Sequence, residues 1–227
     1  MSIKMSKEEN IQKDTKNTPK LQTASPIYSP PLREGLGVGL APLLHCCCAP
    51  CSAAIVEWML ANDIRPILFY CNPNIYPQEE YLIRKNELNR FAEEQGLRVI
   101  DDDYNHEEWL CAVKGLEGEP ERGRRCLQCF KYRLLRAAEK TRELGLTTFT
   151  TTLASSRWKS LDQIAEAGHW AAEQVNNAVR ENAPDAPLVS FDARNWRKGG
   201  LQQRRAELLR QYGFYNQQYC GCEFSMR

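Results

Sequence analysis

Three cysteine motifs contain the residues of this sequence that are best suited to chemistry. Residues 45–51 read His-Cys-Cys-Cys-Ala-Pro-Cys, a second motif pairs Cys126 with Cys129, and a third pairs Cys220 with Cys222. Thiolates bind metals and exchange electrons, and a reduced cytosolic protein has little structural need for cysteines grouped in this way. The spacing therefore predicts a metal site, a thiol redox site, or both.

Four thiolates, two from the first motif and two from the second, match the usual ligand set of a 4Fe-4S cluster. A structural zinc site also uses four thiolates and often contains a Cys-x-x-Cys pair. Adjacent thiolates such as those of Cys47 and Cys48 favour a cluster, because they are easier to place around a cubane than around one ion. A function limited to thiol-disulfide exchange is the third alternative, and spacing alone does not separate the three.

Cys220 and Cys222 flank a single glycine near the end of the sequence. A disulfide between them would close a tight, strained ring that is more easily reduced than a structural bridge, and Gly221 relieves the backbone. The pair is therefore expected to be a redox-active dithiol that relays two electrons. The alternative is two unpaired cysteines near a terminus.

Other polar and sulfur-containing residues are weaker candidates. Cys51 lies one helical turn after the adjacent cysteine pair and is a candidate ligand of a second metal ion, or a residue that lines the pocket. Cys71 and Cys111 are expected to be small core residues. His45 and the acidic run 101–103 are candidate proton donors at strand ends.

Strand-like apolar runs alternate with helical patterns from residue 43 to residue 212. The expected strands lie at 43–44, 66–71, 98–101, 147–153 and 188–191, and the expected helices begin near 50 and cover 77–95, 107–114, 126–144, 161–180 and 201–212. This alternation predicts an α/β fold with a mostly parallel sheet and helices on both faces. The first strand-to-helix loop then forms the floor of the functional crevice, where this sequence has thiols in place of a glycine-rich phosphate loop.

Residues 1–40 are polar and have no periodic apolar face, so they are expected to be a disordered extension or the product of a start codon assigned too early. Residues 41–227 are expected to form one α/β catalytic domain. The sequence shows no apolar run of about 20 residues and no secretory leader. A cytoplasmic protein without a membrane partner is expected.

Two basic segments suggest a nucleic-acid substrate, although the net charge is only +1. One covers residues 121–143, and the other covers 194–210 and includes Trp196. Basic side chains can contact phosphates, and an aromatic ring among them can stack on an unpaired base. Each segment taken alone also fits a solvated helix face.

Five motifs together resemble the QueH family of epoxyqueuosine reductases. In chain order they are HCCCAPCS (45–52), FYCNPNIY (69–76), RCLQC (125–129), FTTTL (149–153) and YCGCEFS (219–225). The resemblance implies an adenine-nucleotide-hydrolase-like fold of the HUP or Rossmann-like type and a cytoplasmic enzyme that acts on tRNA. It also implies the last step of queuosine biosynthesis, in which the epoxide of epoxyqueuosine at the wobble position is reduced and its oxygen leaves as water.

The resemblance also implies roles for seven cysteines. Four would hold a 4Fe-4S cluster, two would form a redox-active disulfide, and one is a candidate ligand of an adjacent iron: Cys47, Cys48, Cys126 and Cys129; Cys220 and Cys222; and Cys51. No cobalamin is implied. Cys46 adds a third consecutive thiol, and we place the ligands at the two cysteines that directly precede Ala49 and Pro50.

The resemblance leaves two competing functions. An ATP-dependent tRNA-thiolating enzyme would need a Ser-Gly-Gly phosphate loop after the first strand, and that loop is missing from the sequence. A zinc-stabilised RNA-binding protein without catalysis would be colourless and stable in air. The expected partners are the anticodon loop of a tRNA and an electron donor that the sequence does not identify.

Overall fold

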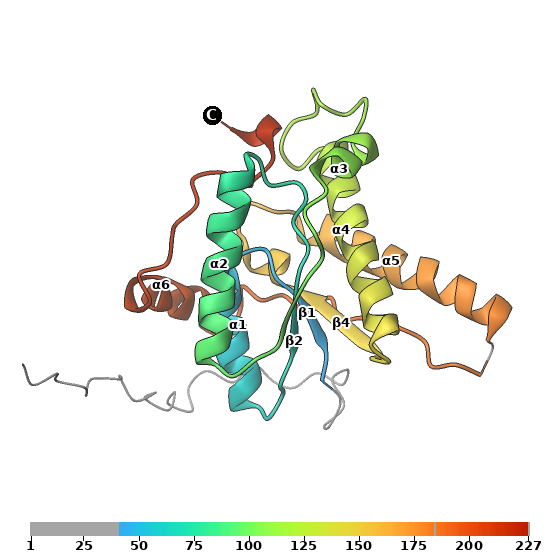
Figure 1. Cartoon of the computed structure of the whole chain (residues 1–227), viewed down its shortest axis with the longest axis horizontal. Helices are drawn as coiled ribbons and strands as arrows, with labels where there is room; N and C mark the ends of the chain where they lie inside the picture. The colour runs from blue at the N-terminus through green and yellow to red at the C-terminus, as the bar shows by residue number, and fades with distance from the viewer. Residues whose placement is uncertain (1–40, 184, 227) are drawn as a thin grey trace, which may run out of the picture.

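A central parallel sheet lies between two layers of helices (Figure 1). The computed structural model describes residues 41–183 and 185–226, so the prediction for residues 1–40 lies outside the described residues. Helices α1, α2 and α6 pack on one side of the sheet, and α4 and α5 pack on the other, with α3 against α4 (Figure 1). This Rossmann-like arrangement confirms the expected α/β fold.

The five strands are short and all parallel. They are β1 (Leu43–His45), β2 (Ile67–Tyr70), β3 (Val99–Asp101), β4 (Thr148–Thr151) and β5 (Ser190–Phe191). They pair in the order β3-β2-β1-β4-β5, so the direction of chain progression reverses between β1 and β4. In such sheets the ligand crevice lies beyond the carboxyl ends of the strands at this switch point.

The helices agree with the expected periodicity. They are α1 (Ala49–Ala61), α2 (Gln78–Glu94), α3 (His106–Ala112), α4 (Arg124–Glu143), α5 (Leu161–Asn182) and α6 (Leu201–Gln211), with short 3-10 helices η2 (Thr152–Ser155) and η3 (Glu223–Ser225). Pro50 lies in the first turn of α1, where its missing N–H costs no hydrogen bond. This helix is buried almost all round, because the sheet, α2 and α6 enclose it.

Most boundaries differ from the expectation by one or two residues, and two of these shifts have a clear local cause. Strand β4 ends at Thr151, because the Thr151 hydroxyl accepts a hydrogen bond from the N–H of Leu153 and starts η2. Helix α4 begins at Arg124 after an extended Gly123, two residues earlier than expected. Cys126 therefore lies in the first turn and Cys129 in the second, so only Cys126 lies where the helix dipole acts most strongly.

The core is built from buried apolar strand residues and the inward faces of the helices. Leu43, Leu44 and Phe149 are fully buried, as expected for strands covered on both faces. Cys71 is buried as predicted, whereas the core prediction for Cys111 was wrong, because this residue is exposed on α3. Among the helices of residues 41–183 and 185–226, none has the length and apolar character needed to cross a bilayer.

Candidate functional site

The first cysteine motif lies at the switch point of the sheet. The chain leaves β1 at His45, passes through residues 46–48 and enters α1 at Ala49. The N–H of Cys47 donates to the Thr152 hydroxyl (3.1 Å) after β4, and the N–H of Cys46 donates to the carbonyl of Phe69 (2.8 Å) on β2. Contacts with β2 and with the first residue of η2 therefore fix the position of this loop.

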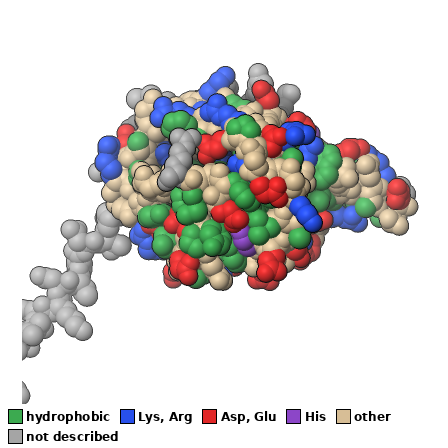
Figure 2. Space-filling view, turned by 90° about the horizontal axis from the view of Figure 1, so that it is seen from above, with side chains coloured by type: hydrophobic (Ala, Val, Ile, Leu, Met, Phe, Trp, Pro, Cys, Tyr) green, Lys and Arg blue, Asp and Glu red, His purple; other side chains and the backbone are tan. Residues whose placement is uncertain are grey.

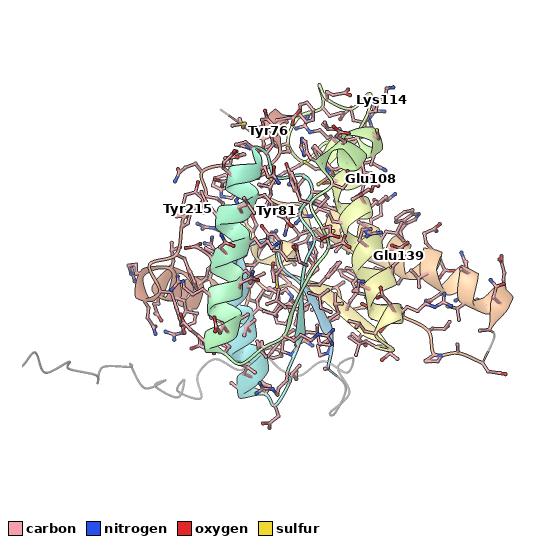
Figure 3. The ribbon with its side chains drawn as sticks, viewed as in Figure 1. Tyr76, Tyr81, Glu108, Lys114, Glu139 and Tyr215 are labelled. Atoms are coloured by element: carbon pink, nitrogen blue, oxygen red, sulfur yellow. The ribbon has the colours of Figure 1, made fainter. Side chains whose placement is uncertain are left out.

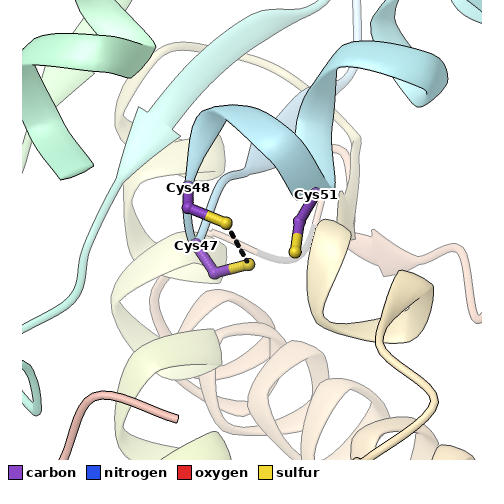
Figure 4. Close-up of side chains that lie close together, drawn as sticks. All are labelled: Cys47, Cys48 and Cys51. Atoms are coloured by element: carbon purple, nitrogen blue, oxygen red, sulfur yellow. Dashed lines mark hydrogen bonds between the residues drawn. The ribbon is translucent and has the colours of Figure 1, made fainter. Parts of the chain in front are cut away.

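Three cysteines of this motif bring their sulfur atoms together (Figure 4). The Sγ atoms of Cys47, Cys48 and Cys51 all lie within 4.8 Å of one another, and those of Cys47 and Cys48 are 3.8 Å apart. Zinc–sulfur bonds are about 2.3 Å long, so sulfurs on one ion lie within roughly twice that distance. The three cysteines, here called the cysteine triad, could hold one metal ion.

The thiols of the cysteine triad differ in acidity. Hydrogen bonds from Cys48 and Cys51 hold the pKa of Cys47 well below its usual range. Donation to Cys47 raises the pKa of Cys48, and it raises that of Cys51 to about 11. Without a metal, we therefore expect one thiolate, at Cys47, that accepts hydrogen bonds from the two neutral thiols. A metal ion bound by all three sulfurs must displace the two remaining protons.

Cys46 is outside the cysteine triad. Its side chain is fully buried in the core, and its thiol donates to the carbonyl of Leu44 (3.3 Å). Burial raises the pKa of this thiol. Of the three consecutive cysteines, Cys46 thus faces the core, and Cys47 and Cys48 belong to the cysteine triad.

Four more cysteines come from α4 and from the segment after α6. Cys129 and Cys222 pack together with Trp109 and Val113 in a small apolar cluster. Cys126 Sγ accepts a hydrogen bond from a backbone N–H (3.3 Å). Burial raises the pKa values of the thiols of Cys126, Cys129 and Cys222. All the cysteines of the described chain are free thiols, including Cys220.

One cavity of about 430 Å³ brings the three motifs together. The cysteines that line it come from α1 and the loop before it, from α4, and from the segment after α6: Cys47, Cys51, Cys126, Cys220 and Cys222. Within the described residues, only the cysteine triad gathers its sulfurs within reach of a single ion. A cubane binds each cysteine through a different iron, so its four ligands spread more widely than those of one ion.

Cationic side chains face these sulfurs. Arg133 is buried and donates to the carbonyl of Cys71 (3.1 Å) and to the side chain of Asn72, while Lys159 and Arg205 line the cavity. Burial by itself lowers the pKa values of Lys159 and Arg205, but the nearby cysteine sulfurs outweigh it and raise both. These cationic side chains therefore favour the thiolate form of the cysteines around them.

The segment that carries Cys220 is anchored by a buried ion pair on α2. Arg84 pairs with Glu80 (2.7 Å) and donates to the carbonyls of Cys220 (3.1 Å) and Tyr219 (3.3 Å). The hydroxyl of Tyr215 donates to Glu80 (2.9 Å), and Figure 3 shows Tyr215 beside α2. The pair thus binds the segment at two places.

Gly221 is required where the segment meets the loop before α2. Its φ is +130°, and a Cβ there would lie 3.0 Å from Ile75 Cγ1 and 3.1 Å from Asn74 Nδ2. Its carbonyl accepts from the N–H of Tyr76 (2.8 Å), the residue labelled near the upper end of α2 in Figure 3. The glycine therefore sets the approach of the two flanking cysteines.

Sequence reasoning missed His106, which ties α3 to the same segment. Its Nε2 lies 2.8 Å from a carboxylate oxygen of Glu223, and its Nδ1 lies 2.7 Å from the carbonyl of Pro73. The ring stacks against Tyr76 and Trp109, with centroids 5.4 Å apart in each case. No local motif marks this histidine, because its partners are distant in sequence.

The candidate proton donors at strand ends have other contacts. Burial lowers the pKa of His45 to about 3, so the neutral ring donates from Nε2 to the carbonyl of Cys71 (3.0 Å) and accepts from Thr151 (2.7 Å). Asp101 contacts Lys85 and Asp102 pairs with Arg136, and none of these acids lines the cavity. Their placement does not support proton donation.

Several members of the two basic segments have acidic partners. The ion pairs join Lys131 with Glu166, Arg136 with Asp102, Lys140 with Glu143, and Arg204 with Glu57. Basic and acidic side chains both lie on the face shown in Figure 2. The stacking prediction for Trp196 was wrong, because its side chain is buried and its Nε1 donates to Thr150.

Comparison with known families identifies the scaffold that carries this site. Residues 42–227 match the sequence model of a family described as epoxyqueuosine reductase QueH. The chain belongs to the epoxyqueuosine reductase QueH family. The match covers β1 and all three cysteine motifs, so it includes the cavity and every cysteine that lines it.

Curated members of the QueH family are similar over most of the chain. Proteins named epoxyqueuosine reductase QueH from Histophilus somni and Haemophilus influenzae are 46% and 45% identical over 185 residues, which are 82% of this chain and 72% and 71% of those proteins. The protein of the same name from Acinetobacter baylyi is 43% identical over 185 residues, or 82% of this chain and 80% of that protein. The name denotes an oxidoreductase, and the resemblance inferred from the motifs is confirmed.

Proposed function

We propose that this protein reduces epoxyqueuosine at the wobble position of tRNA to queuosine, the last step of queuosine biosynthesis. Membership of the QueH family supports the reaction. The observation that carries it for this chain is the single cavity lined by all three cysteine motifs. Its volume of about 430 Å³ lies in the range of small-molecule pockets, and it could admit one nucleoside turned out of an RNA loop.

A 4Fe-4S cluster would be held by Cys47 and Cys48 from the loop before α1 and by Cys126 and Cys129 from α4. The support is an all-thiol donor set beside cationic side chains, with Cys46 turned into the core. When bound, such a cluster supplies single electrons and an iron that can polarise a C–O bond. Cys51 completes the cysteine triad, so it is the residue we assign to an additional iron.

Cys220 and Cys222 would supply the reducing equivalents. Oxidation of the two thiols to one disulfide releases two electrons and two protons, which is what conversion of an epoxide to an alkene and water consumes. Both residues line the cavity as free thiols, and the Arg84–Glu80 pair holds their backbone. An external electron donor would then reduce the disulfide before the next turnover.

Lys159 would provide a proton to the departing oxygen. Its pKa is raised by the surrounding cysteine sulfurs despite burial, which keeps its Nζ charged in the cavity. The strand-end acids have no such access, because they face away into ion pairs. We therefore assign Lys159 the role that the sequence analysis gave to residues at the strand ends.

The test is anaerobic turnover of a stem-loop RNA that carries epoxyqueuosine. Reconstituted protein is supplied with a chemical reductant, and product nucleosides are identified by mass spectrometry. We expect queuosine from the wild type and from Cys111→Ser, a control on an exposed cysteine outside the cavity lining, but not from Cys126→Ser. A fully loaded protein that binds the RNA and leaves the epoxide intact would contradict the proposal.

The role of Cys51 has a separate test. Cys51→Ala should lower the iron content and the turnover rate, because it removes one sulfur of the cysteine triad. A Cys51→Ala protein with the iron content and turnover of the wild type would remove this role. It would leave the four-cysteine cluster assignment untouched.

One observation favours the alternative of a zinc-stabilised RNA-binding protein. The cysteine triad lies within the reach of a single ion, which suits zinc as well as iron. That alternative gives no role to the free thiols of Cys220 and Cys222 in the same cavity. Metal and sulfide analysis separates the two readings.

A further inference from the structure

Trp158 is the most exposed large apolar side chain of the described residues. Its side chain is 77% exposed, yet it lies on the rim of the cavity that holds the cysteines. The other four tryptophans of the chain are buried or partly buried: Trp58, Trp109, Trp170 and Trp196. The indole is thus placed where a ligand that enters the cavity can contact it.

The loop that carries Trp158 is fixed rather than loosely attached. It runs from residue 156 to 160, between η2 and α5. Arg122 donates to the carbonyls of Trp158 (2.9 Å) and Arg157 (3.0 Å). Arg197 donates to the carbonyls of Ser156 (2.5 Å) and Lys159 (2.7 Å). Two guanidinium groups thus bind four consecutive carbonyls, so the indole is presented at a defined place.

The backbone of Arg122 is also held in a defined conformation. Its φ is +67°, a left-handed conformation that is unfavourable for a residue with a side chain. Its carbonyl accepts a hydrogen bond from the side chain of Gln163 (2.8 Å) on α5. Arg122 is therefore held by Gln163 through its backbone while its side chain binds the loop. These contacts order the loop without a ligand.

We propose that Trp158 is a stacking platform for a base of the anticodon loop adjacent to the wobble nucleoside. This rests on the proposed function, in which the wobble nucleoside enters the cavity. The cavity admits about one nucleoside, so the neighbouring nucleotide must remain at the rim, where the indole lies. Unpaired RNA bases turned out of their stack are commonly bound by aromatic faces.

The charges around the indole favour RNA over a protein partner. Arg122, Arg157 and Lys159 also line the cavity. The guanidinium of Arg122 is engaged by the loop carbonyls, whereas Arg157 is exposed. An aromatic face beside an exposed cationic side chain suits a base and its phosphate, since the two contacts lie on one nucleotide. Tryptophan and arginine also occur at protein–protein contacts, and the measurements below distinguish RNA from a protein electron donor.

Intrinsic fluorescence gives a direct readout of the stacking. A stem-loop RNA carrying epoxyqueuosine is titrated into metal-loaded wild type, Trp158→Phe and Trp158→Ala. The control is Trp170→Phe, because Trp170 is partly buried on α5 against Lys131 and does not line the cavity. We expect quenching in the wild type and the control, and its loss in Trp158→Phe. An unchanged quench in Trp158→Phe would overturn the proposal.

Affinity gives the second readout. We expect Trp158→Ala to weaken RNA binding by about 5- to 150-fold, the range given by stacking of one base, while Trp158→Phe keeps most of the affinity. In turnover the loss should appear in KM more than in kcat, because the indole touches no reacting group. Unchanged RNA affinity with a raised KM for the electron donor would overturn the proposal in favour of a protein contact.

These outcomes separate the stacking site from the proposed function. If the wild type reduces epoxyqueuosine and Trp158→Ala binds the RNA as tightly as the wild type, only the stacking site is overturned. A wild type whose Trp158 fluorescence is quenched by the RNA but which never reduces it keeps the stacking site and overturns the reductase assignment. The binding measurement does not depend on turnover, so each result stands alone.

Discussion

The Arg84–Glu80 ion pair anchors the segment of the redox cysteines, and its loss should have a large and specific effect. The side chains of Arg84 and Glu80 are only 3% and 9% exposed, so Arg84→Met leaves a buried carboxylate without its partner. Breaking a buried pair from one side costs about 3–5 kcal/mol. A domain of this size has about 5–15 kcal/mol of stability, so the variant should fold with a clearly lower urea midpoint.

A second variant separates the charge from the anchoring. Glu80→Gln combined with Arg84→Met removes the unpaired carboxylate, so it should recover part of the stability lost in Arg84→Met. It still lacks the donors to the carbonyls of Cys220 and Tyr219. We therefore expect Cys220 to react faster with an alkylating reagent than in the wild type in both variants, as local opening of the segment exposes it.

Arg180→Met is the matched control for the unfolding measurement. Arg180 pairs with Glu173 at 2.8 Å, but both side chains are about half exposed, so the pair should contribute only about 0–1 kcal/mol. Urea unfolding and the alkylation rate of Cys220 are measured on all variants. The reasoning is refuted if Arg84→Met matches Arg180→Met in both measurements.

The remaining predictions concern individual cysteines. Cys220→Ser should keep the wild-type iron content but lose multiple turnovers, and loss of iron would instead make Cys220 a ligand. Cys46→Ala should keep iron and sulfide, because this thiol faces the core; a lower content, measured alongside thermal unfolding, would shift the ligand register by one residue. In metal-free protein, the low pKa of Cys47 keeps its sulfur ionised below the ordinary cysteine pKa of about 8.5. Alkylation of Cys47 should therefore stay rapid at pH values well below about 8.5. An alkylation rate that already falls as the pH drops through about 8.5 would contradict the shared-thiolate arrangement.

The sequence predicted the scaffold well because local patterns determine it. Apolar runs such as 66–71, separated by amphipathic helices, indicated a parallel sheet, and the switch point then placed the cysteine loop at the crevice. Two of the boundary shifts have local causes. The Thr151 side chain ends β4 early, and the extended Gly123 starts α4 early, neither of which changes the apolar period.

The supporting contacts of the site could not be predicted in the same way. Arg84 and Cys220 are 136 residues apart in sequence, and His106 and Glu223 are 117 apart. Nothing in the spacing of either pair links its members. The same holds for Trp158, whose loop is held by Arg122, whereas Trp196, the tryptophan that the sequence suggested, is buried.

Iron, acid-labile sulfide and zinc content of protein purified without oxygen tests the central claim most directly. We expect about four iron and four sulfide per chain, or somewhat more iron if Cys51 takes an additional ion. One zinc without sulfide, persisting after attempted anaerobic cluster reconstitution, would contradict the redox mechanism. The cysteine triad would then be a structural zinc site in an RNA-binding protein.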